Sequence, residues 1–415
     1  MPFIIESQRG GRAGARRFAV TAVVVSVALA IGSVLMLAGT AGAATLGGLA
    51  VGSPAASPSW KIQSTPNPAG SDGNNLEGVS CTSATACTAV GYYYNSSGST
   101  ITLGEQWNGT TWKIHTGPNV TSLNGVSCTS ASACTAVGGI LSNSGDVVTL
   151  AERWNGTSWK TQTTPNPAGA GYSQLNGVSC TSASACTAVG YYYNTSGIYF
   201  ALAEGWNGTS WTIHATVKPA GSSEPELEGV SCTSASACTA AGGYENSSDA
   251  YRTLAERWNG TSWKIQSTTN PGPESDYLYG ASCASASACT AVGYQQLNTS
   301  AKVTLAERWN GTTWTTQTTP NPAGPTDVFS GVSCASATAC TAVGSYAESN
   351  AEPTGPFAEG WNGTTWTVQT TPSPAGTDES PLNGVSCTAA STCTAVGEYQ
   401  NSSGTYLTLA ERETA

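Results

Sequence analysis

Hydrophobic and polar residues follow a pattern that repeats along the chain about every 50 residues. One period, residues 175–217, shows the pattern clearly. The runs 175–180 (LNGVSC) and 186–193 (CTAVGYYY) are rich in apolar, β-branched and aromatic residues, and 199–206 (YFALAEGW) alternates apolar with polar positions. The run 209–217 (TSWTIHATV) has the same character. This pattern predicts four antiparallel strands in every repeat.

Two turn signals separate these strands. A small polar segment between paired cysteines separates the first two, and an Asn-Gly pair separates the last two. For the Asn-Gly pair we expect a type I′ turn, in which both central residues have positive φ. Four strands in a period of this length are typical of a β-propeller blade.

The two ends of the repeat array are complementary. The last repeat stops at YLTLAERETA without a tryptophan-containing fourth strand, whereas residues 57–70 (SPSWKIQSTPNPAG) match such a strand without the three before it. We expect Trp60–Ser64 to pair with Tyr406–Arg412 and to close the ring, since closure leaves no exposed sheet edge. The predicted fold is all-β, a seven-bladed β-propeller with four antiparallel strands per blade. Its repeat units lie near 75–117, 122–166, 174–218, 226–270, 277–321, 328–373 and 381–415 plus 59–66.

The first residues have the pattern of an export signal. Four arginines precede an apolar run from Phe18 to Ala38, and small residues at Ala41 and Ala43 fit a cleavage site. We therefore expect a signal peptide over 1–43, a linker over 44–58, a propeller over 59–415 and a secreted protein. The alternative is an uncleaved N-terminal helix that anchors the protein, because the apolar run approaches the ~20 residues that span a bilayer.

The cysteines occur in seven pairs, six positions apart within each pair. A zinc site would bring two pairs, or a pair and histidines, to one ion, and a redox site would favour C-x-x-C. An exported chain with an even number of cysteines favours disulfides across each hairpin. The expected bridges are Cys81–Cys87, Cys128–Cys134, Cys180–Cys186, Cys232–Cys238, Cys283–Cys289, Cys334–Cys340 and Cys387–Cys393.

The turn before the fourth strand resembles the hairpin of sialidase-like, Asp-box propellers, in which a glycine turn precedes a tryptophan. Residues 155–159 (NGTSW) stand at that place, with asparagine where an Asp-box has aspartate, and the resemblance extends over 59–415. A kelch-like or lectin propeller is the alternative family. A sialidase would need three arginines around the substrate carboxylate, but of five arginines after residue 43 only Arg252 lies outside the repeated AER positions. Sialidase activity is therefore not expected.

Composition restricts the possible partners. The chain has 15 basic and 25 acidic residues, and removal of 1–43 takes away four basic and one acidic residue, which changes the net charge from −10 to −13. Nucleic acid and anionic membranes bind basic surfaces, so neither is an expected partner after signal cleavage. Isolated aspartates without calcium-loop spacing predict no metal site, and no cofactor motif occurs.

No catalytic constellation stands out, and a non-enzymatic protein is favoured. The two histidines, His115 and His214, occupy equivalent positions where other repeats have glutamine, and we interpret them as surface substitutions. A glutamate recurs in all seven repeats, as Glu256 does in one, so hydrogen bonding between blades is its expected role. The paired tryptophans, such as Trp154 and Trp159, are expected to pack between blades.

The variable loops indicate where a ligand would bind. The cysteine turns and Asn-Gly turns hardly vary and share one face of a propeller, whereas the other loops vary and share the opposite face. Tyrosines beside Asn, Ser and Gly suit contact with a glycan or an extracellular protein. The candidate ligand-binding residues are Tyr92, Tyr93, Tyr94, Tyr172, Tyr191, Tyr192, Tyr193, Tyr244, Tyr251, Tyr277, Tyr279 and Tyr294.

The predicted function is therefore a monomeric, secreted propeller scaffold that binds a glycan or protein ligand through its variable face. Two alternatives remain. An extracellular glycoside hydrolase or polysaccharide lyase of propeller fold would use carboxylates near the first strands, such as Glu77, Glu226 and Glu228. A purely structural or adhesive protein of the cell envelope would have neither turnover nor a soluble ligand.

Overall fold

The computed structural model describes residues 59–115, 117, 121–321, 324–347, 355–377 and 379–414. These residues belong to one compact unit and form strands, turns and bends without any helix. Within the same ranges there is accordingly no helix with the length and hydropathy needed to span a membrane. The predicted signal peptide, 1–43, and linker, 44–58, lie outside the described residues.

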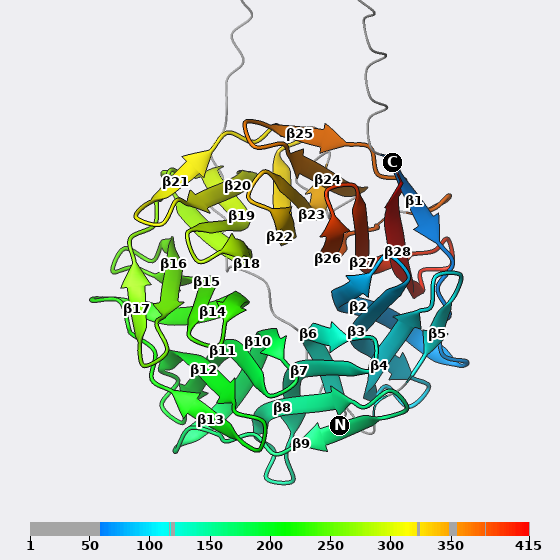
Figure 1. Ribbon diagram of the computed structural model, residues 1–415, viewed down its shortest axis with the longest axis horizontal. Helices are drawn as coiled ribbons and strands as arrows, with labels where there is room; N and C mark the ends of the chain where they lie inside the picture. Colours follow the sequence, from blue (N-terminus) through cyan, green and yellow to red (C-terminus); the bar gives the residue numbers. More distant parts are fainter. Residues whose placement is uncertain are drawn as a thin grey trace, which may run out of the picture. The chain divides into compact units, whose positions relative to one another are not determined.

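The strands fall into four sets according to their position in the repeat (Figure 1). Nearest the centre lie β2 (Ser71–Ser83), β6 (Thr121–Ser130), β10 (Ala170–Ser182), β14 (Ser223–Ser234), β18 (Ser275–Ser285), β22 (Thr326–Ser336) and β26 (Leu382–Ala389). The second strands are β3 (Ala86–Asn95), β7 (Ala133–Leu141), β11 (Ala185–Asn194), β15 (Ala237–Glu245), β19 (Ala288–Asn298), β23 (Ala339–Ala347) and β27 (Thr392–Gln400). The third strands are β4 (Thr100–Trp107), β8 (Val147–Trp154), β12 (Tyr199–Trp206), β16 (Tyr251–Trp258), β20 (Ala301–Trp309), β24 (Gly355–Trp361) and β28 (Tyr406–Thr414). The outer strands are β5 (Trp112–Ile114), β9 (Trp159–Gln162), β13 (Trp211–His214), β17 (Trp263–Gln266), β21 (Trp314–Gln317), β25 (Trp366–Gln369) and β1 (Ser59–Gln63).

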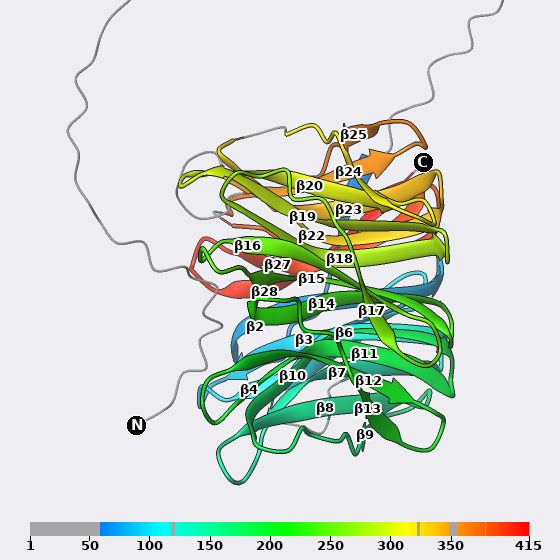
Figure 2. The ribbon, with the colours of Figure 1, turned by 90° about the vertical axis from the view of Figure 1, so that its left-hand side faces the viewer.

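Within each repeat the strands pair antiparallel in chain order and form a blade. In the β10–β13 blade, Cys180 pairs with Cys186, Cys186 with Trp206, and Trp206 with Trp211. Inner strands of successive blades contact one another, as β10 contacts β6 and β14. The blades are arranged around a centre in Figure 1 and are stacked against one another in Figure 2. The chain is therefore an all-β propeller.

The N-terminal strand belongs to the sheet that contains the last strands. β1 pairs antiparallel with β28, from Ser59 opposite Thr414 to Gln63 opposite Ala410, in a sheet ordered β1-β28-β27-β26. This is the pairing that the truncated last repeat predicts. The inner strand of the first repeat, β2, also contacts β26, β27 and β28 of the last repeat.

The second strands are made of small buried residues because both of their faces are covered. In β11, Ala188 and Val189 are 0% exposed. A bulge in β10 between Leu175 and Gly177 brings the inner strand close to Gly190, where a Cβ would lie 2.0 Å from the Gln174 carbonyl oxygen. Only glycine fits there, which explains the recurrent AVG or AAG sequence.

Tryptophans fill the spaces between blades, as predicted. Trp263 is 2% exposed and packs with Leu227, Leu254 and Trp258. In each of six blades the two tryptophans that flank the Asn-Gly turn form a cross-strand pair, for example Trp154 and Trp159 with centroids 5.7 Å apart. Such pairs place large apolar areas where adjacent sheets meet, which stabilises the stacking of the blades.

The recurrent glutamate is fully buried, and at Glu256 and Glu307 it connects neighbouring blades. Glu256 Oε2 accepts a hydrogen bond of 3.2 Å from the Val217 N–H, and Glu307 Oε2 accepts one of 3.2 Å from the Thr269 N–H. Both donors lie in the connection that leaves the preceding blade, so the predicted structural role is confirmed for these two residues. Burial raises the pKa of Glu256 to about 7.

All fourteen cysteines form local disulfides, so the interpretation of the pairs as disulfides is confirmed. The bridges are Cys81–Cys87, Cys128–Cys134, Cys180–Cys186, Cys232–Cys238, Cys283–Cys289, Cys334–Cys340 and Cys387–Cys393. Each bridge crosses the turn between a first and a second strand. Disulfides persist in oxidising environments, which are typical of the cell exterior.

The Asn-Gly turns differ from the prediction. Gly208 has a φ of 96°, but Asn207 is not among the residues with positive φ, so the turn is not type I′. The loop has four residues, and Asn207 Oδ1 accepts hydrogen bonds of 2.9 Å from the Thr209 and Ser210 N–H groups. The prediction of type I′ is therefore wrong, because the asparagine side chain organises a longer loop in place of a two-residue turn.

Candidate functional site

The propeller has two different faces, which we name by their loops. The cysteine face carries the disulfide hairpins and the Asn-Gly loops, which touch each other: a Cβ added to Gly208 would lie 2.9 Å from Ser184 Cβ. The variable face carries the loops between second and third strands and the connections between blades. The invariant turns therefore gather on one face and the variable loops on the other.

The structure buries some of the candidate tyrosines on the variable face and leaves others partly accessible. Tyr277 and Tyr294 are buried, at 5% and 7% exposure, and Tyr94 is the exposed one. The remaining candidates have intermediate burial, and they are Tyr92, Tyr93, Tyr172, Tyr191, Tyr192, Tyr193, Tyr244, Tyr251 and Tyr279.

Four tyrosines gather on one side of the β10–β13 blade, and we call them the tyrosine cluster: Tyr172, Tyr191, Tyr193 and Tyr199. Tyr172 stacks on Tyr191 and Tyr193 with centroid distances of 5.6 and 5.0 Å. Tyr199 lies 5.8 Å from Tyr191 and 5.1 Å from Tyr193. Alternate residues of β11 share this side, since side chains alternate across a strand. Tyr192 points the other way and stacks on Phe200 at 5.0 Å.

Three glutamates of β14 face the tyrosine cluster and its neighbours. Glu224 Oε2 accepts a hydrogen bond of 2.8 Å from the Tyr251 hydroxyl. The buried Tyr277 hydroxyl lies 3.0 Å from Glu226 Oε2 and 2.9 Å from Glu228 Oε1. This arrangement joins the β14–β17 blade to the blade that follows it.

The electrostatics of this region follow from burial beside carboxylates. Burial raises the pKa of Tyr191 above its ordinary value, and the charges of Glu226 and Glu228 add to the effect. Burial, followed by the hydrogen bond and charge of Glu224, raises the pKa of Tyr251 in the same way. Tyr191 and Tyr251 are therefore neutral hydrogen-bonding groups beside acceptors.

The first blade has a smaller aromatic group. Tyr92 and Tyr94 meet edge to face at 5.5 Å, whereas Tyr93 packs into the core cluster beneath them. Glu77 Oε1 accepts a hydrogen bond of 2.9 Å from Asn75 Nδ2. Burial and the nearby charges of Glu77 and Glu379 raise the pKa of Glu398 to about 8. This region thus places a carboxyl group that is protonated at neutral pH near other acidic groups.

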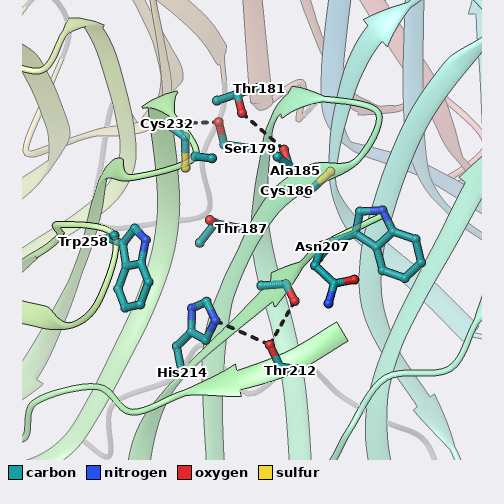
Figure 3. Close-up of a pocket in the computed structure, with 14 residues that line it drawn as sticks. Ser179, Thr181, Ala185, Cys186, Thr187, Asn207, Thr212, His214, Cys232 and Trp258 are labelled. Atoms are coloured by element: carbon teal, nitrogen blue, oxygen red, sulfur yellow. Dashed lines mark hydrogen bonds between the residues drawn. The ribbon is translucent and has the colours of Figure 1, made fainter. Parts of the chain in front are cut away.

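The structure also has a pocket that the sequence did not reveal, on the cysteine face between the β10–β13 and β14–β17 blades (Figure 3). Its volume is about 250 Å³. His214 and Trp258 stack at 4.5 Å with an interplanar angle of 9° and form one side. Thr212 Oγ1 lies 3.5 Å from His214 Nε2 and donates to the Gly205 carbonyl oxygen at 3.4 Å.

The interpretation of the histidines as surface substitutions is wrong. His214 stacks on Trp258 of the following blade, and His115 lies 4.9 Å from Trp154 of the blade that follows its own. Both imidazoles are partly buried, which lowers their pKa. A signal was available in the sequence, because both histidines occur in repeats that lack the usual arginine of AER.

The described part of the chain contains no group of three or more His, Cys, Asp or Glu side chains placed to hold a metal ion. Asp276, one of the isolated aspartates, is buried and accepts a 2.9 Å hydrogen bond from the Gly272 N–H, with Arg252 at 3.8 Å. Arg252, which stands apart from the repeated arginines, thus has a partner within the fold.

Comparison with known proteins supports the fold. No family model matches the chain, and no curated protein matches it. Among solved structures, YCF48 bound to D1 peptide is similar with a TM-score of 0.50 and 10% identity, over 87% of this chain and 98% of that chain. A mutant of Aleuria aurantia lectin in complex with alpha-methyl-L-fucoside is similar with a TM-score of 0.41 and 14% identity, over 75% of this chain and 99% of that chain. A Hadza microbial sialidase is similar with a TM-score of 0.45 and 10% identity, over 71% of this chain and 65% of that chain. These neighbours are β-propellers, and the first likeness supports that fold for this chain.

Proposed function

We propose that this chain is a secreted, non-enzymatic β-propeller that binds a glycan or protein ligand through its variable face. The observation that carries the proposal is the tyrosine cluster, whose aromatic rings lie beside Glu226 on the face where the loops vary. Aromatic rings stack on the C–H faces of sugars or on partner side chains, and tyrosine loses little conformational entropy on binding. The adjacent carboxylates accept hydrogen bonds from hydroxyl or N–H donors.

The proposal includes a closed ring of seven blades. A hydrogen bond of 2.9 Å from a cysteine N–H to a serine Oγ joins each blade to its neighbour, for example from Cys180 to Ser127 and from Cys232 to Ser179. The Cys81 N–H donates in the same way to Ser386 Oγ of the last repeat. Pairing of β1 with β28 would complete the last blade, and closure removes the free sheet edges.

Export and domain organisation remain part of the proposal. The disulfides favour an oxidising compartment, consistent with a signal peptide over 1–43 that precedes a linker over 44–58. The alternative location is a membrane anchored by an uncleaved N-terminal helix. A closed, acidic propeller with its edges paired would be a monomer. Its net charge disfavours nucleic acid and anionic lipid as partners.

A glycan and peptide array probed with residues 44–415 would identify the ligand. The variants Tyr193→Ala and Tyr199→Ala should lower affinity for it at least tenfold, because each removes a ring from the cluster. Ile198→Ala, a change at a 48% exposed residue of the adjoining loop, is the control and should bind normally. Wild-type affinity in both tyrosine variants would refute the proposed site, provided that their circular dichroism is unchanged.

A glycoside hydrolase is the second candidate, because one observation favours it. Glu398 lies near Glu77 and Glu379, and burial raises its pKa to about 8. A carboxyl group with a raised pKa can act as the general acid in the hydrolysis of a glycosidic bond. Release of reducing sugar from a polysaccharide panel would support it if Glu398→Gln abolished the release. Absence of any release by the wild-type protein would leave binding as the function.

A further inference from the structure

Four blades insert an arginine into the gap between themselves and the next blade on the cysteine face. Each guanidinium lies over the indole ring of a tryptophan in that next blade, a contact stabilised by the ring quadrupole. The guanidinium carbon to ring centroid distances are 5.8 Å for Arg153 and Trp206, 5.9 Å for Arg257 and Trp309, 4.6 Å for Arg308 and Trp361, and 5.0 Å for Arg412 and Trp107.

Two of these arginines make the same second contact. Arg308 Nη2 donates to the Ala337 carbonyl oxygen at 2.6 Å, and Arg412 Nη2 donates to the Ala84 carbonyl oxygen at 2.6 Å. Both alanines stand three residues after the first cysteine of their disulfide turn. The gap between blades is thus a site for a guanidinium group, formed by an indole face and the carbonyl of a cysteine turn.

The pocket between the β10–β13 and β14–β17 blades lies where one of these arginines is missing. Gly205 occupies the arginine position, and His214 replaces the glutamine found on most outer strands. A Cβ at Gly205 would lie 2.4 Å from His214 Cε1, at the outer edge of a side chain that can rotate. An arginine at this position would therefore require the imidazole to move from its place in the gap.

The pocket keeps the groups that hold a guanidinium elsewhere. It is lined by Trp258, the equivalent of the stacked tryptophans, and by Ala235, which is equivalent to Ala337 and Ala84. His214 Nδ1 is buried and has no hydrogen-bond partner within the described ranges. Burial lowers the pKa of His214, so at neutral pH its imidazole is uncharged and can accept a hydrogen bond from a cation.

We propose that this pocket binds the guanidinium group of an arginine side chain from a partner molecule, at the position that the chain's own arginines fill in other blades. The acidic chain attracts basic partners, which favours such a ligand. The site lies on the face opposite the tyrosine cluster, so it is separate from the proposed function. An experiment can therefore refute either proposal without affecting the other.

A related pocket in the first blade is not included in the proposal. In the first blade Gln106 takes the arginine position, and a cavity of about 370 Å³ is lined by Trp107, His115 and Ala131. Lys113 also lines this cavity, whereas the corresponding residue of the first pocket is the neutral Thr212. The ammonium group of Lys113 opposes a second cation, so we assign arginine binding to the pocket at Gly205 alone.

Titration calorimetry with N-acetyl-arginine amide tests the proposal, and N-acetyl-citrulline amide serves as the uncharged control of the same shape. We expect one arginine site per chain and at least tenfold weaker binding of the citrulline compound. The double variant Gly205→Arg/His214→Gln restores the residues of the other blades and should lose the site. Tyr193→Ala should leave arginine binding unchanged.

The reciprocal variant Arg257→Gly/Gln266→His gives a second, independent readout, because it should create a new pocket and raise the stoichiometry from one to two. Equal binding of the arginine and citrulline compounds, or an unchanged site in Gly205→Arg/His214→Gln, would overturn the proposal. So would the absence of arginine binding to the wild-type protein, or a stoichiometry of one in a folded reciprocal variant.

Discussion

The buried glutamate of each repeat makes the stability of the propeller depend on pH, and Glu256 allows this dependence to be isolated. Its side chain is 0% exposed, and Oε2 accepts one hydrogen bond, from the Val217 N–H. Glu256→Gln keeps the shape and the acceptor but cannot ionise. The difference between the two proteins therefore reports the cost of ionising the carboxyl group inside the fold.

The sign follows from the pKa of Glu256, which burial raises from the ordinary value of 4.5 to about 7 in the folded protein. Below pH 4.5 the carboxyl is protonated in both states, and its contribution to stability is fully present. Between the two values the unfolded chain releases the proton and the folded chain retains it, so stability falls as pH rises. This loss of stability is complete above the pKa of Glu256 in the folded protein, and it amounts to roughly 3 kcal/mol.

Urea denaturation of the wild type and Glu256→Gln at pH values from 4 to 9 measures this effect. The free energy of unfolding of the variant, relative to wild type, should rise by roughly 3 kcal/mol between pH 4 and pH 9. Glu274→Gln, a substitution at an exposed glutamate, is the matched control. Its free energy of unfolding should change with pH in the same way as that of the wild type. A constant difference between Glu256→Gln and wild type would show that the carboxylate is well solvated or paired, and would refute the reasoning.

Three further substitutions test the packing of one blade by urea denaturation at a single pH. Trp263→Ala removes an indole that is 2% exposed and should lower the free energy of unfolding by about 3–5 kcal/mol; a loss below 1 kcal/mol would contradict its place in the core. Asn259→Ala removes the acceptor of two 2.9 Å backbone hydrogen bonds and should cost about 1 kcal/mol, which Asn259→Asp should largely restore. Replacing Cys232 and Cys238 together by alanine should cost about 2 kcal/mol, because the bridge closes a short loop, and unchanged stability would argue against that bridge.

The repeated sequence made the strand order and the cysteine pairing predictable. Residues 199–206 were expected to form a third strand, and β12 runs over Tyr199–Trp206. The fourth strand was expected over 209–217, but β13 spans only Trp211–His214. The chain leaves the sheet after His214, and Val217 then donates its N–H to Glu256 of the next blade, a contact that no local pattern contains.

The environment of each tyrosine was less predictable. The hydroxyl of Tyr277 reaches Glu226 and Glu228 of the preceding blade. Tyr294 was another candidate and is also buried. Tyr277 contacts the preceding blade, whereas Tyr294 packs on Tyr277 and Tyr279 of its own blade. The order of residues within one repeat specifies neither contact.

The interface between the β10–β13 and β14–β17 blades differs from several of the other interfaces between blades. Trp211 Nε1 and Trp314 Nε1 donate to glutamines of the preceding blades at 3.1 Å, whereas Trp263 Nε1, like Trp112 Nε1 and Trp366 Nε1, has no partner in the described part of the chain. Between the inner strands, Asn176 Nδ2 donates to Glu228 Oε2 at 3.0 Å.

The interface thus lacks the arginine and the tryptophan hydrogen bond that some other interfaces have, and it has a side-chain hydrogen bond between its inner strands. The contacts shared by all repeats, such as the 2.9 Å hydrogen bond from the Cys232 N–H to Ser179 Oγ, remain at this interface. Because these shared contacts hold the blades together, residues at both ends can change without loss of the fold. Both proposed binding sites lie at this interface, where Gly205 and His214 replace residues of other repeats at one end and the tyrosine cluster adds aromatic side chains at the other.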